Sequence, residues 1–106
     1  MGWKYRLEFA GKELRRLIND GGETLENIVA IYKQMIACLE RWKKILRKSD
    51  KENWEYAIET MIDDLECAYP DLEDKSLNYH EEEENLNYYL RDFYDLCDAA
   101  RVWIGV

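Results

Sequence analysis

The segment 79–104 restricts the fold more than any other part of the chain. Its apolar side chains follow one another at intervals of seven, four, three, four, three and four residues. Such intervals bring side chains to one face of an α-helix, because a helix has about 3.6 residues per turn. We therefore predict a helix over this segment, ended by Gly105. Its buried face is formed by Tyr79, Leu86, Leu90, Phe93, Cys97, Ala100 and Ile104.

The opposite face of this predicted helix is acidic. It carries a row of carboxylates around one tyrosine, in the order Glu81, Glu84, Tyr88, Asp92, Asp95 and Asp98.

The first segment, 3–19, has two competing patterns. One helical stripe includes six apolar residues, namely Trp3, Leu7, Ala10, Leu14, Leu17 and Ile18. Residues 3–9 also alternate between apolar and charged types, as in a half-buried strand. Gly11 weakens the helical interpretation, since glycine is unfavourable inside a helix. We predict a helix that leaves Tyr5 and Phe9 pointing away from the core, with a short strand over residues 3–9 as the alternative.

Two more helices are predicted between the Gly21-Gly22 turn and the only proline. Thr24 is placed to cap a helix over residues 25–48, whose basic end suits the negative end of the helix dipole. Ser49 and Glu52 have the spacing of a capping box for a third helix, which Pro70 ends. The fourth helix is expected to start near Ser76 or Asn78.

Four amphipathic helices with short polar connections predict an all-α fold, a small antiparallel four-helix bundle in a single domain over residues 1–106. No apolar run approaches the roughly 18 residues of a membrane span, and the N-terminal residues lack a signal-peptide pattern. Three widely spaced cysteines, Cys38, Cys67 and Cys97, indicate reduced thiols and a cytoplasmic protein, with Cys67 towards the polar side of its helix.

The net charge of −8 is unevenly distributed. Residues 1–48 carry 11 basic and 6 acidic side chains, whereas residues 49–106 carry 4 basic and 17 acidic side chains. A nucleic-acid-binding protein normally has a basic surplus, so we predict no direct binding of nucleic acid. The acidic second half favours a basic protein partner.

Residues for catalysis are sparse. The single histidine, His80, stands beside four glutamates at a predicted helix start, and Cys97 belongs to the buried stripe. One histidine cannot supply a di-iron site, and Gly21-Gly22 lacks the spacing and lysine of a phosphate-binding loop. We therefore expect a non-enzymatic protein with no catalytic, cofactor-binding or metal-binding residues.

The carboxylate rows suggest a function in protein binding. Our hypothesis is an acidic nucleic-acid mimic, comparable to a phage-encoded inhibitor, that blocks the nucleic-acid site of a basic partner. Tyr56, Tyr88, Tyr94 and Trp103 are expected to be exposed anchors. The predicted partner-binding residues are Glu55, Tyr56, Glu59, Asp63, Glu81, Glu84, Tyr88, Asp92, Asp95 and Asp98.

The alternative is a homo-oligomeric structural or regulatory protein whose acidic faces serve solubility only. Its homodimer contact would be an apolar surface formed by Tyr5, Phe9, Val102 and Trp103.

Overall fold

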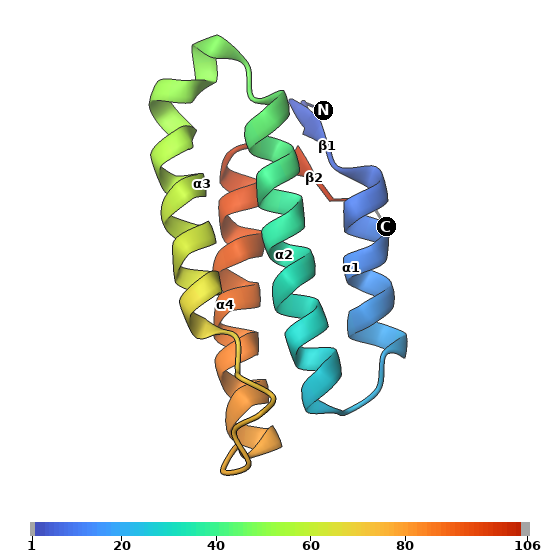
Figure 1. Ribbon diagram of the computed structural model, residues 1–106. Helices are drawn as coiled ribbons and strands as arrows, with labels where there is room; N and C mark the ends of the chain where they lie inside the picture. Colours follow the sequence, from blue (N-terminus) through green and yellow to red (C-terminus); the bar gives the residue numbers. More distant parts are fainter. Residues whose placement is uncertain (1, 105–106) are drawn as a thin grey trace.

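The computed structural model describes residues 2–104 as four helices with a short two-stranded sheet at one end (Figure 1). The predicted all-α helical bundle is confirmed. Consecutive helices run in opposite directions in Figure 1, so each short connection turns the chain back on itself. The elements are β1 (Tyr5–Arg6), α1 (Glu8–Asp20), α2 (Leu25–Ile45), α3 (Lys48–Ala68), α4 (Tyr79–Ala99) and β2 (Val102–Trp103).

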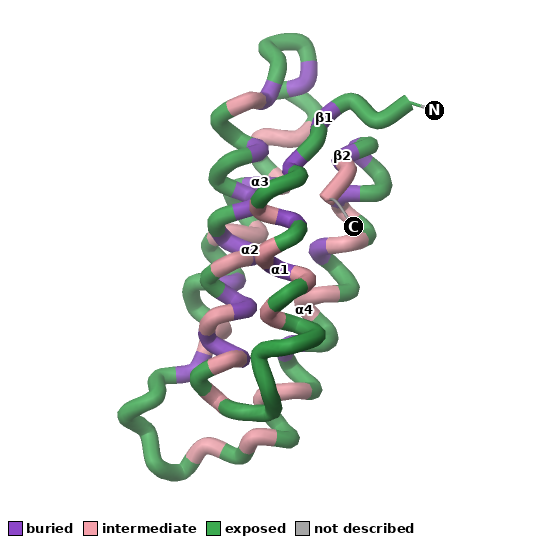
Figure 2. The backbone as a smooth tube through the Cα atoms, turned by 90° about the vertical axis from the view of Figure 1, so that its right-hand side faces the viewer, coloured by how far each residue is buried: buried purple, intermediate pink, exposed green. Residues whose placement is uncertain are grey.

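Helix α2 is the centre of the bundle and packs against α1, α3 and α4. This position explains its unusually wide apolar stripe, since a helix with several neighbours buries more of its circumference. Buried positions follow α2 through most of its length, whereas α1 and α3 bury fewer residues (Figure 2). The side chains of Tyr32, Met35, Leu39 and Trp42 are completely buried.

Two predicted helix starts are confirmed by side-chain caps. The Thr24 hydroxyl accepts a hydrogen bond from the backbone N–H of Asn27 at 3.1 Å, and the Asn78 side chain accepts one from Glu81 at 3.2 Å. Each bond satisfies a backbone donor that has no partner within the helix. Helix α3 ends at Ala68, before Pro70, as predicted.

The prediction of a helix over residues 3–9 was wrong for most of that segment. Tyr5 and Arg6 form β1, which pairs in parallel with β2, and α1 begins at Glu8. The strand pattern decides which side chains are buried: Tyr5 and Leu7 are buried, whereas Trp3, expected in the core, is 51% exposed. Phe9 does point away from the core, as predicted, and is 90% exposed.

The C-terminal helix is shorter than predicted. Helix α4 ends at Ala99, and Arg101 takes the left-handed conformation with a φ of 60°. The carbonyl oxygen of Arg101 accepts hydrogen bonds from the backbone N–H groups of Lys4, at 2.8 Å, and Tyr5, at 3.3 Å. Pairing with the N-terminal segment therefore replaces the last helical turn. Gly105, the predicted helix terminator, lies outside the described residues.

The capping box predicted at Ser49–Glu52 does not form. Helix α3 begins at Lys48, and no side chain caps it. Instead, the Tyr5 hydroxyl accepts a hydrogen bond from the Arg47 backbone N–H at 2.9 Å and donates one to the buried Asp50 carboxylate. Lys4 Nζ also donates to Asp50, at 3.3 Å. The start of α3 is thus fixed by a strand more than 40 residues away in sequence.

Gly11 lies in α1 against the C-terminal segment. A Cβ atom at this position would approach the carbonyl carbon of Ile104 to 2.5 Å and its oxygen to 2.6 Å. The absence of a side chain therefore allows the backbone of Ile104 to lie directly on α1. This contact explains a glycine that is otherwise unfavourable inside a helix.

The three cysteines differ in their access to solvent. Cys38 and Cys97 are buried, and burial raises the pKa of each thiol to about 12, whereas Cys67 is exposed as predicted. Because the thiolate is the reactive form, we expect only Cys67 to react quickly with Ellman's reagent in the native protein. Release of thionitrobenzoate should indicate one thiol per chain in buffer and three in denaturant. Fast reaction of a second native thiol would contradict this prediction.

Candidate functional site

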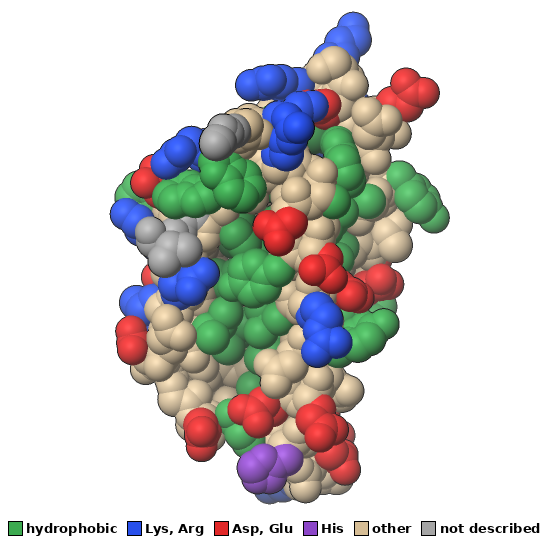
Figure 3. Space-filling model, turned by 180° about the vertical axis from the view of Figure 1, so that it is seen from behind, with side chains coloured by type: hydrophobic (Ala, Val, Ile, Leu, Met, Phe, Trp, Pro, Cys, Tyr) green, Lys and Arg blue, Asp and Glu red, His purple; other side chains and the backbone are tan. Residues whose placement is uncertain are grey.

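The outer face of α4 carries a row of exposed carboxylates, and Arg91 is the one lysine or arginine of this helix. Glu81, Glu84, Asp92, Asp95 and Asp98 are all exposed, and Tyr88 between them is 61% exposed. Among residues 2–104, none of the ion pairs involves a carboxylate of α4. The rear view shows several acidic side chains in the lower part and along the right of the molecule, whereas most of the basic side chains lie in its upper and left parts (Figure 3). These carboxylates are therefore open to a partner.

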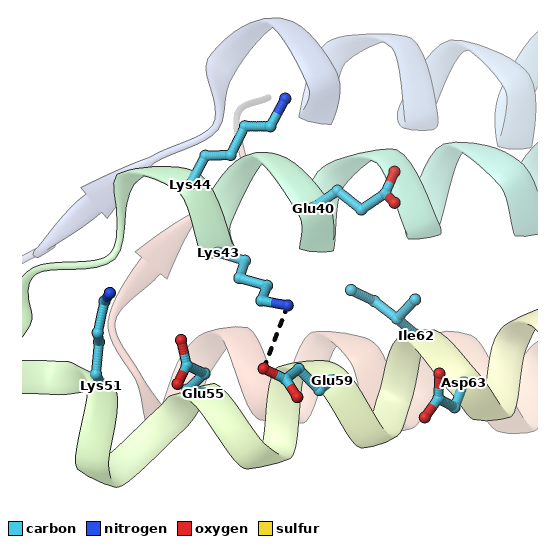
Figure 4. Close-up of a pocket in the computed structure, with 8 residues that line it drawn as sticks. All are labelled: Glu40, Lys43, Lys44, Lys51, Glu55, Glu59, Ile62 and Asp63. Atoms are coloured by element: carbon cyan, nitrogen blue, oxygen red, sulfur yellow. Dashed lines mark ion pairs between the residues drawn. The ribbon is translucent and has the colours of Figure 1, made fainter.

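A second acidic row, formed by Glu55, Glu59 and Asp63 on α3, has a different environment, because it lines a groove that α3 shares with α2. Glu59 Oε1 lies 3.2 Å from Lys43 Nζ, and this ion pair spans a groove of about 710 Å³ (Figure 4). The groove has mixed charge, so its lysines offset part of the acidic row. Its lining residues are Glu40, Lys43, Lys44, Lys51, Glu55, Glu59, Ile62 and Asp63.

The two acidic rows do not line a common groove. Glu55 is half-buried at the α2 side of α3, and none of the α4 carboxylates lines the groove there. Tyr56 projects from α3 and is 81% exposed. Among the described aromatic contacts, Tyr88 of α4 packs against Tyr89 and not against Tyr56. Of the ten predicted partner-binding residues, the six on α4 form a coherent face of their own.

Two of the four predicted aromatic anchors are not exposed as expected. Tyr94 is half-buried against Phe93, with ring centroids 5.6 Å apart, and burial raises the pKa of its hydroxyl. Trp103 is half-buried in β2, where the Arg6 guanidinium lies 4.2 Å from the centre of its ring. Tyr56 and Tyr88 remain the exposed pair.

A second groove, which the sequence analysis did not predict, lies where α1 and α4 flank α2. Its volume is about 230 Å³, and its lining is mixed, with apolar side chains at its base and polar side chains around its opening. The rear view shows hydrophobic side chains gathered in this hollow beside α4 (Figure 3). The apolar lining residues are Ile18, Ile28, Ile31, Tyr79, Leu86 and Leu90.

Ile18 could have indicated this groove. It follows Leu17 directly on the predicted stripe of α1, and two adjacent apolar residues widen a stripe beyond what one neighbouring helix covers. In the structure Leu17 packs against the core, whereas Ile18 remains 37% exposed at the wall of the groove.

The rim of this second groove is polar and acidic. The Tyr79 hydroxyl donates a hydrogen bond to Glu83 Oε2 at 3.1 Å, which holds that carboxylate beside the opening. Burial raises the pKa of Tyr79, and the hydrogen bond to Glu83 and the charges of Glu83 and Glu23 raise it further. The Asn27 side chain donates to the carbonyl oxygen of Leu17 at 2.9 Å, so the turn between α1 and α2 is fixed.

The single histidine and the buried cysteine of α4 lie far apart. His80 is exposed at the start of α4, and Cys97 is buried near the end of the same helix. Seventeen residues of helix separate them by roughly 25 Å, which is too far for a nucleophile and its base. Within the described part of the chain, no three His, Cys, Asp or Glu side chains are grouped in a way that would hold a metal ion.

Of the helices in residues 2–104, none is both long and apolar enough to cross a bilayer. The chain matches no protein-family model, no curated protein and no solved structure.

Proposed function

We propose that this chain is a non-enzymatic protein-binding module whose α4 face occupies the nucleic-acid site of a basic, nucleic-acid-processing protein. The observation that carries the proposal is the row of exposed carboxylates on α4, none of which takes part in an ion pair among the described residues. Unpaired carboxylates keep their full charge available for arginine and lysine side chains of a partner.

The spacing of the row supports a mimic of nucleic acid. Side chains three or four positions apart on a helix are about 5–6 Å apart. Phosphates follow one another every 3.4 Å or so along one strand of a duplex. The α4 row is therefore coarser than a strand of phosphates but has the same sign and a comparable repeat, and a groove that holds a phosphate backbone offers it several basic contacts.

Tyr88 adds an aromatic contact surface to the row of carboxylates. It lies in the middle of the row with most of its side chain exposed. Tyrosine is frequent in the small set of interface residues that contribute most of the binding free energy, because it combines a large rigid surface with a hydroxyl. We assign Tyr88 the role of central anchor and the carboxylates the role of orienting the partner.

The test is charge reversal on α4. We expect the variant Glu84→Lys, Asp92→Lys, Asp95→Lys to lose capture of basic nucleic-acid-processing proteins from a bacterial lysate, because a repulsive surface replaces an attractive one. Bound proteins would be identified by mass spectrometry after washes at low and high salt. The wild-type complex should dissociate at high salt and should be displaced by added duplex DNA.

A control variant carries the same change in net charge on another surface. Glu52, Asp64 and Glu66 are exposed on α3 and line neither groove, so their replacement by lysine should leave capture intact. Retention of the partner by the α4 variant, or equal loss in both variants, would contradict the proposal.

A homo-oligomeric structural protein remains the second candidate, and the exposed ring of Phe9 favours it. The apolar surface expected for a homodimer is smaller than predicted, because Tyr5 and Val102 are buried in the chain itself. Of the four residues expected in this surface, only Phe9 is exposed and Trp103 is half-buried. Light scattering that gives a monomer at tens of micromolar would contradict this candidate.

A further inference from the structure

We propose that the groove between α1 and α4 receives an apolar side chain of the same basic partner that covers the α4 row. This inference rests on the proposed function and adds a specific anchoring point to it. The partner segment would carry a leucine-like side chain flanked by lysine or arginine.

The size and lining of the groove suit one or two side chains better than a cofactor. Its volume of about 230 Å³ is below the range of about 300–1,000 Å³ that is usual for small-molecule sites. Ile28, Ile31 and Leu86 are buried beneath it, and Ile18 and Leu90 form its walls. An inserted apolar side chain would remove the exposed parts of Ile18 and Leu90 from water, and the hydrophobic effect favours this burial.

The rim specifies the charge of the occupant. Glu83 and Glu23 both line the groove, and no lysine or arginine does. The hydrogen bond from Tyr79 fixes Glu83 in place, so a basic group of the partner meets a carboxylate that is already oriented. An apolar floor with an acidic rim is complementary to an apolar residue beside a basic one.

The groove and the acidic row belong to adjacent flanks of one helix. Glu83 and Asn87 line the groove, and their sequence neighbours Glu84 and Tyr88 belong to the outer face. A basic segment lying along α4 therefore reaches both surfaces at once. Charge accelerates association and sets orientation, and a buried apolar side chain slows dissociation.

The experiment uses two labelled synthetic peptides of equal length and charge. The first peptide has leucines three or four positions apart with lysines between them. In the second peptide, serine replaces each leucine. Fluorescence anisotropy at several salt concentrations would give the affinity of each peptide for the full chain. We expect the leucine peptide to bind about tenfold more tightly, the size of effect typical for one well-buried interface residue.

Two variants test whether the difference in affinity between the two peptides arises in the groove. Asn87→Trp fills the groove from its exposed rim without removing a core residue, and Ile18→Asn removes an apolar wall. Each should abolish the advantage of the leucine peptide and leave binding of the serine peptide unchanged. Asn53→Trp, an equivalent change at an exposed position of α3 outside both grooves, is the matched control. Circular dichroism would verify that all variants are folded.

The outcomes separate this inference from the proposed function. If both peptides bind with equal affinity, or if Asn87→Trp and Asn53→Trp have equal effects, the proposed binding of an apolar side chain in the groove is wrong. Binding of both peptides to the α4 row would still support the proposed function. Failure of both peptides to bind, or binding that survives lysine at Glu84, Asp92 and Asp95, would overturn the groove and the proposed function together.

Discussion

Replacement of Asp50 by alanine should lower the free energy of unfolding by about 2–3 kcal/mol at pH 7, since hydrogen bonds to a buried charged group are worth about 1.5–3 kcal/mol. Asp50 is buried and accepts hydrogen bonds from the Tyr5 hydroxyl and from Lys4 Nζ. The substitution leaves the Tyr5 hydroxyl without an acceptor inside the protein. Urea unfolding followed by tryptophan fluorescence would measure the loss.

The loss should depend on pH. The hydrogen bond from Tyr5 holds the pKa of Asp50 below its usual range, with further lowering by the hydrogen bond and charge of Lys4 and by the charge of Arg47. A carboxyl whose pKa is lowered by folding contributes its stabilisation above its unfolded pKa of about 3.9 and loses it as the pH falls through the folded value. The difference between wild type and Asp50→Ala should therefore be full at pH 7 and shrink below pH 4.

Glu52→Ala is the control for general effects of charge at the start of α3, because Glu52 is exposed in the same region. It should change stability by less than about 0.5 kcal/mol. In addition, Tyr5→Phe and Asp50→Ala should be strongly non-additive, since each removes the same hydrogen bond. Additive effects, or a loss that does not change between pH 7 and pH 3, would show that the hydrogen bond between Tyr5 and Asp50 is not what stabilises this end of the protein.

Gly11→Ala should also destabilise the protein, by about 1–3 kcal/mol, the usual cost of forcing an extra group into a packed position. The new methyl group would meet the backbone of Ile104, which cannot rotate away as a flexible side chain would. Helix propensity alone gives the opposite sign, since alanine is favoured over glycine inside a helix by about 1 kcal/mol.

Whether Gly11→Ala raises or lowers the stability therefore decides between helix propensity and the clash with Ile104. Thermal unfolding measures this change directly. Lys12→Ala, at the next and exposed position of α1, is the control for helix propensity and should leave the melting temperature nearly unchanged. A Gly11→Ala variant more stable than wild type would mean that the C-terminal segment does not press on α1.

Local patterns in the sequence predicted a helix boundary well where residues close to that boundary determine it. Thr24 caps α2 as predicted, α4 starts directly after Asn78, one of the two positions expected, and Pro70 marks the end of α3. In each case the residues responsible lie within a few positions of the helix end. The errors have one origin, namely the N-terminal strand.

Pairing of β1 with β2 moved three boundaries that local patterns could not place. It converted residues 5–6 from helix to strand and ended α4 at Ala99. It also gave the Arg47 backbone N–H the Tyr5 hydroxyl as its acceptor, in place of a capping box. All three contacts join segments more than 40 residues apart. A periodicity within one segment carries no information about such contacts.

The candidate site was predictable to a similar extent. The exposed face of α4 follows from the helical spacing of its carboxylates, because that helix has no neighbour on its outer side. The position of the α3 row opposite Lys43, and the groove beside Ile18, depend on how helices are turned relative to one another. That rotation is set by the packing of the whole core.

The strand pairing also imposes an order on folding. Helices α1, α2 and α3 contact their neighbours in sequence, so their contacts close short loops. Tyr5 must instead find Val102, 97 positions later, and closing so long a loop is entropically costly until the helices have brought the two segments together. We therefore expect β1 and β2 to pair late in folding, after the transition state. Damage to this pairing should then accelerate unfolding, shorten the lifetime of the native protein and leave the rate of folding nearly unchanged.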